Sequence, residues 1–332
     1  MTNRFYKRLT YSLSFTLPIL VVSGVLFSLS FLINPPLGQF LFDVGNYAYY
    51  LSYAVLAAAI AYAIGDRVSI VPALIGGFML FDGSVGLLGS VVIGFFAGYL
   101  TKALLGLFPD MPKTLLGIFT VFVYPVLLTV MTLGLAFLMN QYLSMPLMNV
   151  IAFLFYDHHW LVITLSVILA SLMAFDLGGP VNKMAYLIAI MTLANGLTST
   201  VMAAVIAGGM VPPLVVAVIR IFNHREEDER WWITAIQGLS FLSEGAISFV
   251  DQHKKYMTPI MMIGSGLAGG VVGWFSLSTR IPHGGILVAV FMDAWYYFLL
   301  ALVIGMVTTF ILLAIFNRKI KRKKTSETPL QV

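Results

Sequence analysis

The sequence predicts an all-α integral membrane protein with about ten transmembrane helices and additional re-entrant hairpins. Of its 332 residues, 60% are hydrophobic and 10% are charged, whereas a soluble domain is roughly 45–50% apolar and about 25% charged. The apolar residues fall into uncharged runs close to the ~20 residues that a helix needs to cross a bilayer. The basic residues gather at the two ends of the chain, as expected beside terminal spans.

The apolar runs supply the predicted spans. A run at 184–219 is long enough for two crossings, with a break near Gly208-Gly209 and Pro212-Pro213. Shorter stretches at 69–81, 142–156 and 231–242 are predicted to be re-entrant, interfacial or buried among other helices. The first run is followed by Asn34-Pro35-Pro36 rather than a small-residue cleavage site, which predicts a retained span. The other uncharged runs are 13–32, 47–64, 84–100, 114–139, 160–175, 256–278 and 294–316.

The net charge of +5 comes largely from the termini. This placement predicts that both termini are cytoplasmic and that the crossings are even in number, and it argues against nucleic acid as a partner. The basic tail at 317–332 is also expected to attract anionic membrane lipid. The NHREEDER segment at 223–230 is predicted to be a solvated loop, with docking of a cytoplasmic protein as the alternative. The terminal basic residues are Arg4, Lys7, Arg8, Arg318, Lys319, Lys321, Arg322, Lys323 and Lys324.

Polar residues inside apolar sequence are the candidates for function, because a charge at membrane depth is costly and normally faces a cavity or a partner. The first cluster, FDLGGPVNKMAY at 175–186, interrupts two apolar runs with a backbone break, and broken helices often mark transporter binding sites. An ordinary loop with interfacial charges is the alternative. The residues concerned are Asp176, Gly178, Gly179, Pro180, Asn182 and Lys183.

The second cluster is QGLSFLSEGAISFVD at 237–251. Glu244 and Gly245 lie there in a stretch too interrupted by glycine and serine to form a regular span. A carboxylate accepts hydrogen bonds from two hydroxyl groups at once, which suits a sugar. A structural ion pair between Glu244 and Lys183 is the alternative.

The third cluster, IPHGGI at 281–286, places His283 between a proline and the pair Gly284-Gly285. A histidine side chain can donate and accept toward a hydroxyl or carry a proton. A lone histidine in a loop is more often incidental than functional, so this pattern by itself favours a histidine without a role. The pair His158-His159 lacks further metal ligands at helical spacing, and its position beside Trp160 is typical of a membrane interface.

No motif for independent chemistry is present. The sequence contains no phosphate loop, dinucleotide fingerprint, nucleophile elbow or HExxH pattern, and no cysteine. We therefore expect no metal, no cofactor and no ATPase activity, and we assign no catalytic residue.

The clusters together resemble one family. FDLGGPVNKMAY, AAVIAGGMVPPL, GLSFLSEGAISF and PHGGI, with IGDRVSIVPALIGGF and LLGSVVIGFFAGYL before them, occur in the order found in fructose-type enzyme IIC membrane subunits of the phosphoenolpyruvate-dependent sugar phosphotransferase system. The resemblance runs from about residue 13 to residue 316. The family usually has Thr-Glu-Gly-Ala-Ile-Pro-Phe where this chain has Ser243 before Glu244 and Ser248 in place of the proline.

The resemblance implies a homodimer in the bacterial inner membrane. It implies a scaffold and dimerisation half at 1–158, a sugar-binding transport half at 159–316 and a cytoplasmic tail at 317–332. Glu244 and His283 would contact a fructose-like sugar, and Asp176, Asn182 and Lys183 would line or brace the cavity. The backbone breaks lining that cavity would be Gly178, Gly179, Pro180, Gly245, Gly284 and Gly285.

The phosphoryl donor implied by the resemblance is a phospho-IIB protein. Many relatives carry the IIB domain, with its phosphocysteine, on the same chain. Because this chain has no cysteine, we expect the donor to be a separate protein. Two alternatives are an ion-coupled secondary sugar transporter, in which Asp176 and Glu244 carry protons or sodium, and a membrane enzyme acting on lipid-linked substrates. The second should show a metal or nucleophile constellation, and none is visible.

Overall fold

The computed structural model describes residues 2–81, 85–107, 112–193, 198–223, 231–292 and 294–326. Within these ranges the chain is helical, and its β-structure is limited to an isolated antiparallel bridge between Ser199 and Thr279. The helices group into two compact units. The first contains Met1–Asp157, Ile190–Thr198 and Arg280–Gly284, and the second contains His158–Ala189, Ser199–Thr279 and Gly285–Val332.

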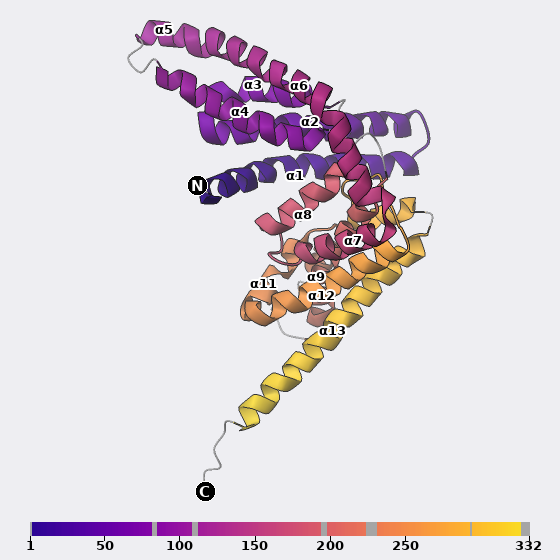
Figure 1. Cartoon of the computed structure of the whole chain (residues 1–332). Coiled ribbons are helices and arrows are strands. Elements are labelled where there is room, and N and C mark those ends of the chain that lie inside the picture. Colours follow the sequence, from indigo (N-terminus) through magenta and orange to yellow (C-terminus); the bar gives the residue numbers. More distant parts are fainter. Residues whose placement is uncertain are drawn as a thin grey trace. The chain divides into compact units, whose positions relative to one another are not determined.

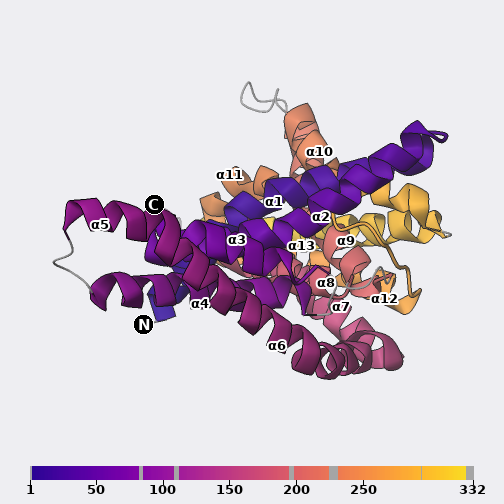
Figure 2. The same ribbon diagram turned by 90° about the horizontal axis from the view of Figure 1, so that it is seen from above.

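The first unit is a bundle of long apolar helices joined by short turns. Helix α2 packs against α1, α3 and α4, and α3 also packs against α6; Figure 2 shows α3 alongside α2 and α6. The elements are α1 (Thr2–Leu32), α2 (Leu37–Gly65), η1 (Arg67–Ser69), α3 (Ile70–Phe78), α4 (Gly86–Leu107), α5 (Lys113–Ile118), η2 (Phe119–Val123), α6 (Tyr124–Ala152) and η3 (Phe153–Asp157).

Small residues explain why α2 and α4 approach each other closely. A Cβ added at Gly94 would lie 2.7 Å from the carbonyl oxygen of Ala57, and one added at Gly98 would lie 2.8 Å from Cβ of Ile64. Helices in a membrane associate through close packing of this kind, because lipid supplies no hydrophobic force between them. The glycine-rich run 89–98 therefore forms a packing face.

The second unit contains the remaining helices and the irregular segments between them. Helix α12 lies along α13 (Figure 1) and also packs against α7 and α9. The elements are α7 (His159–Met173), α8 (Pro180–Met191, whose last two residues belong to the first unit), α9 (Thr200–Asn223), α10 (Trp231–Leu239), η6 (Ser243–Ala246), α11 (Ile247–Val250), η7 (Asp251–His253), α12 (Lys254–Trp274), η8 (Gly285–Phe291) and α13 (Trp295–Ser326).

Helix α9 is the central helix of the second unit. It supplies a candidate span, Thr200–Phe222, in which 83% of the most apolar window is buried. The predicted break at 208–213 is wrong, because α9 runs continuously through Gly208-Gly209 and Pro212-Pro213. A side chain at Gly208 would collide with the backbone of α7 at Ala170. These glycines therefore serve close packing, and the chain leaves helical structure earlier, after α8.

Seven helices of the described chain are long and apolar enough to cross a membrane, and Arg67–Phe78 and His159–Met173 are shorter apolar helices. This confirms the predicted all-helical membrane class, while the number of crossings stays a prediction. The stretch 142–156, predicted to be a separate short piece, instead continues one run from Leu115 to Phe155. Helix α6 continues through Pro146, although proline lacks an N–H to donate within the helix.

The two ends of the second unit differ in chemistry. At one end Tyr256 of α12 contacts Phe316 of α13, with ring centroids 4.8 Å apart, and Lys254 and Lys255 begin α12 there. At the other end the rings of Trp160 and Trp274 pack 5.7 Å apart, and Phe275 stacks on Tyr297 at 4.0 Å. Aromatic residues lie at both ends, as at the two interfaces of a membrane, and the lysines mark one end as basic. The end with Trp160 and Trp274 is here called the aromatic end.

Candidate functional site

The loop between α7 and α8, residues 174–179, is held by Asp176. Its carboxylate accepts hydrogen bonds from the backbone N–H groups of Val181 (2.7 Å) and Asn182 (2.8 Å), the orphan donors of the first turn of α8. Pro180 begins that helix, where its missing N–H has no consequence. A Cβ at Gly179 would lie 2.5 Å from the Asp176 carboxylate. Asp176 therefore closes the helix end and gives the loop its shape.

Asn182 connects this loop to a second irregular segment. Its side chain is 6% exposed, and Nδ2 donates to the carbonyl oxygen of Met173 at 2.6 Å and to Oγ of Ser243 at 3.0 Å. Ser243 is 61 residues away in sequence. One buried amide thus joins the end of α7, the start of α8 and the segment that carries Glu244. Lys183 follows in the same turn and is half-buried.

The second segment, residues 231–250, is here called the Glu244 hairpin and comprises α10, η6 and α11. Its first helix, α10, ends at Leu239, and Phe241, two residues further on, has φ +65°. The N–H of Phe241 donates to Gly238 O and that of Leu242 to Gln237 O, a helix ending that usually places glycine at this position. The Phe241 ring instead packs against Gly209 and, at 5.6 Å between centroids, against Tyr186. Packing in the second unit holds this uncommon backbone conformation.

Glu244 lies in the tight turn η6 with its side chain exposed. A Cβ at Gly178, which has φ +88°, would collide with the Glu244 carboxylate, so the two irregular segments touch at this point. Within the described ranges the Glu244 carboxylate makes no hydrogen bond or ion pair, and the alternative of a Lys183–Glu244 ion pair is not observed. The carboxylate is therefore held in place but available to a ligand.

The depth of this cluster follows from α9. A Cβ at Gly245 would lie 3.2 Å from Cβ of Pro213 and 2.7 Å from Oε1 of Gln237. Pro213 is about 20 Å along the helix axis from the start of α9 and about 15 Å from its end, at 1.5 Å per residue. Glu244 is therefore near the middle of a membrane-spanning helix, where an exposed carboxylate normally faces a cavity or a partner.

Arg220, in the last turn of α9, braces both arms of the Glu244 hairpin. Its Nη1 donates to Oγ1 of Thr234 in α10, and its Nη2 donates to Oγ of Ser248 in α11 at 3.0 Å. The sequence did not single out Arg220, nor Ser243 and Gln237 as site residues. The sequence signal that could have found it is Ser248, which replaces the proline of the family pattern and accepts a hydrogen bond from Arg220.

His283 lies in the first unit, in the stretch Arg280–Gly284. Its main chain packs against Gly24 of α1 so closely that a Cβ at Gly24 would collide with the His283 carbonyl oxygen. The side chain is 6% exposed, and burial lowers the pKa of the imidazole to about 4, so the ring is neutral at physiological pH. Gly284 and Gly285 follow with φ +151° and +56°, and Gly285 already belongs to the second unit.

The structure thus brings six predicted site residues, named at the end of this paragraph, together in the second unit. His283 and Gly284 belong to the first unit. His159, of the predicted interface pair, has Nδ1 3.4 Å from Oγ of Ser276 at the aromatic end of the second unit. Residues 224–230 and the end of the basic tail, the proposed docking segments, lie outside the described residues. The six are Asp176, Gly178, Gly179, Asn182, Glu244 and Gly245.

Comparison with known proteins identifies relatives across the whole chain. The chain is 36% identical over 284 residues to the fructose permease IIC component of Bacillus amyloliquefaciens, covering 82% of this chain and 91% of that protein. It is 34% identical over 344 residues to the PTS system fructose-specific EIIABC component of Bacillus subtilis (strain 168), covering 97% of this chain. Because it covers 53% of that protein, the chain spans about half the length of this relative.

A solved structure shares the fold. The N,N'-diacetylchitobiose-specific IIC transporter ChbC superposes with a TM-score of 0.66 over 98% of this chain and 96% of that one, at 11% sequence identity. The fructose-like permease IIC component 2 of Escherichia coli (strain K12) is 26% identical and covers 97% of this chain. No protein-family model matches the chain.

Proposed function

Because the chain belongs to the fructose-type membrane (IIC) subunits of the sugar phosphotransferase system, we propose that it binds a fructose-like sugar through Glu244. In this proposal the sugar crosses the membrane on the second unit and is phosphorylated by a IIB protein. The observation that carries the proposal is the carboxylate of Glu244, which lies beside the middle of the candidate span α9, is exposed, and pairs with none of the described residues.

The chemistry of the cluster suits a polyhydroxylated ligand. A carboxylate accepts from two hydroxyls at once, and such charge-assisted hydrogen bonds are stronger than neutral ones. The side chains of Asp176 and Asn182 already form hydrogen bonds within the loop and to the hairpin. We therefore propose that they hold the cavity in shape and do not contact the sugar. For His283 a role as sugar contact remains a prediction from the sequence, and its imidazole is neutral because burial lowers the pKa to about 4.

Phosphorylation would make transport one-way. A phosphoryl group adds a charge of about −1.5 to −2 near neutral pH, and a charged group is opposed by the apolar core of the membrane. The B. subtilis relative is described as an EIIABC component, which supports a IIB partner for this chain.

The proposed orientation places the basic end of the second unit in the cytoplasm. Lys254 and Lys255 begin α12, and α13 ends in the basic tail beside them. The positive-inside rule then puts the C-terminus in the cytoplasm and the aromatic end at the outer interface of the bacterial inner membrane. We propose that the N-terminus is cytoplasmic as well, that the first unit is the scaffold and that two copies form a homodimer.

The test is uptake of labelled fructose into membrane vesicles, with and without phosphoenolpyruvate and the soluble phosphotransferase proteins inside. We expect fructose to accumulate as its phosphate only when the donor proteins are present, and an imposed proton or sodium gradient to have no effect. Accumulation of unmodified sugar that follows an ion gradient would establish the ion-coupled alternative instead. Competition by unlabelled ketoses and mannose derivatives would then define the sugar.

A smaller effect on transport is expected when the hydrogen bond between Arg220 and Ser248 of the Glu244 hairpin is removed. Ser248→Ala removes the acceptor of the Arg220 Nη2 bond, and the loss of one hydrogen bond of about 1 kcal/mol corresponds to a roughly fivefold change. We expect the apparent KM for the sugar to rise about fivefold while the maximal rate changes little, because the brace holds α11 directly after the turn of Glu244. Initial uptake rates over a range of sugar concentrations measure both quantities.

Two further variants make the Ser248 result specific. Ser248→Thr keeps the hydroxyl and should retain the wild-type KM. Ser240→Ala removes an exposed hydroxyl of the same hairpin whose oxygen bonds to none of the described residues, and it should change neither quantity. Equal KM values for Ser248→Ala and wild type would show that Arg220 does not position Glu244.

A further inference from the structure

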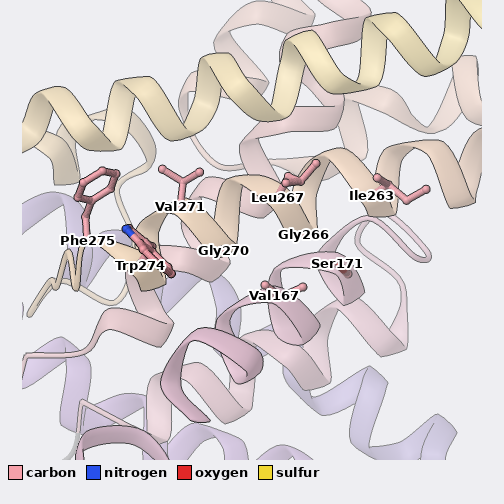
Figure 3. A pocket seen from close by; sticks show the side chains of 9 residues that line it. All are labelled: Val167, Ser171, Ile263, Gly266, Leu267, Gly270, Val271, Trp274 and Phe275. Atoms are coloured by element: carbon pink, nitrogen blue, oxygen red, sulfur yellow. The ribbon is translucent and has the colours of Figure 1, made fainter. Parts of the chain in front are cut away.

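An apolar groove lies between α7 and α12, away from the Glu244 cluster. Its volume is about 520 Å³. Figure 3 shows Val167 and Ser171 of α7 facing the α12 ribbon at Gly266 and Gly270. The remaining lining residues are Ile263, Leu267, Val271, Trp274 and Phe275, so the Ser171 hydroxyl and the Trp274 indole N–H are the polar side-chain groups of its wall.

The groove is built into the backbone of α12. A Cβ at Gly266 would collide with Oγ of Ser171, whereas a Cβ at Gly270 would meet only Cγ2 of Val167, at 3.1 Å. At Gly266 the Ser171 hydroxyl takes the place of a side chain, whereas the missing side chain at Gly270 leaves the groove open above the helix. Its rim is exposed: Ile263 is 49%, Leu267 44% and Trp274 57% accessible.

The length of the groove indicates whether a helix or a single acyl chain fits it. From Ile263 to Trp274 it follows α12 for about 16 Å at 1.5 Å per residue, which is about half the ~30 Å hydrocarbon core of a bilayer. It begins at the aromatic end of the unit, where Trp160 packs on Trp274, and stops before the half of α12 that starts at Lys254. A partner helix is about 10–12 Å wide and would need a seam along the whole span, so the groove matches one acyl chain from one leaflet.

We propose that this groove is a binding site for one acyl chain of a phospholipid in the leaflet at the aromatic end of the second unit. The chain lies over Gly266 and Gly270, and its glycerol and headgroup lie at the level of Trp274, His159 and Ser276. The indole of Trp274 suits that level, because tryptophan places an apolar ring and a polar N–H at the membrane interface. An acyl chain seated there adds van der Waals contacts along the groove and so stabilises the α7–α12 pair.

The test fills the groove. Gly270→Leu places a side chain in it, and Gly134→Leu makes the same change in α6, where a Cβ at Gly134 would meet nothing within 4 Å. Protein purified in mild detergent is mixed with phosphatidylglycerol and, separately, with phosphatidylethanolamine, and the retained lipids are counted by native mass spectrometry. We expect wild type and Gly134→Leu to retain one phospholipid more than Gly270→Leu, and added lipid to raise the Tm of the first two only.

Equal lipid retention by Gly270→Leu and Gly134→Leu would overturn the proposal, and so would a change of oligomeric mass in Gly270→Leu, which would assign the groove to a second copy. If Gly270→Leu fails to fold, wild type and Trp274→Phe are compared with phospholipid brominated on its acyl chains. The fluorescence that depends on Trp274 should then be quenched at a lower lipid fraction than that of the other tryptophans. None of these results bears on sugar transport, so the two proposals stand or fall separately.

Discussion

Glu244→Gln is expected to lower the rate of donor-dependent sugar uptake about hundredfold or more at subsaturating sugar. The substitution keeps the size of the side chain but replaces an ionised acceptor of two hydroxyls by a neutral amide. Hydrogen bonds to a charged group contribute about 1.5–3 kcal/mol each, and about 2.7 kcal/mol corresponds to a hundredfold change. The amide would also present a donor where the sugar presents one, so that one buried polar group stays unpaired.

The control for this variant is Asp251→Asn. Asp251 lies seven residues after Glu244, just beyond the hairpin, is well exposed and pairs with Lys254 at 3.9 Å, so it offers the same chemical change outside the proposed sugar site. We expect Asp251→Asn to transport normally, because exposed ion pairs contribute about 0–1 kcal/mol. Equilibrium binding of labelled fructose to the purified protein separates binding from phosphorylation. Wild-type binding by Glu244→Gln would remove this residue from the sugar site.

The second large effect is expected from Gly178→Ala. The backbone at Gly178 has φ +88°, a conformation that disfavours any side chain and costs of order 1–3 kcal/mol when a non-glycine residue adopts it. The added methyl group would also occupy the position of the Glu244 carboxylate. We expect loss of more than about nine-tenths of uptake together with a lower Tm, since the Glu244 carboxylate must leave its position and the backbone at residue 178 is strained.

Gly106→Ala is the matched change for Gly178→Ala. Gly106 lies in α4, and a Cβ there would meet nothing within 4 Å, so alanine should leave uptake unchanged and raise the Tm slightly through its better helix propensity. The diagnostic quantity is sugar affinity in the Gly178→Ala protein that remains folded. An unchanged affinity would mean that the contact between Gly178 and Glu244 has no part in holding the sugar site.

The sequence predicted the second-unit cluster because its signals are local. Asp176, the Gly178-Gly179-Pro180 break and Glu244 stand out wherever polar or helix-breaking residues interrupt apolar runs, and the structure shows the two segments in contact. The all-helical membrane class followed from composition in the same way. The sequence did not distinguish the roles of the two carboxylates. That of Asp176 accepts hydrogen bonds from the first turn of α8, whereas that of Glu244 does not cap a helix.

Other features depend on tertiary contacts that no local pattern reveals. Phe241 adopts a backbone conformation typical of glycine because its ring packs on Gly209 and Tyr186, residues 32 and 55 positions away. The Gly208-Gly209 and Pro212-Pro213 pairs were interpreted as a break, but close packing keeps α9 helical through them. Arg220 looked like the end of an apolar run, and its role appears only once Thr234 and Ser248 are seen around its guanidinium group.

The composition of the first unit limits how such proteins can recombine. That unit is assembled from three separate stretches of chain, and the main chain of His283, encoded far downstream, rests on Gly24 with no room for a side chain. A chimeric gene joined after codon 157 would set the Gly24 helix of one parent against the His283 loop of another. A workable exchange of this unit between relatives must therefore carry residues 190–198 and 280–284 along with residues 1–157, so the inherited module is discontinuous in the gene.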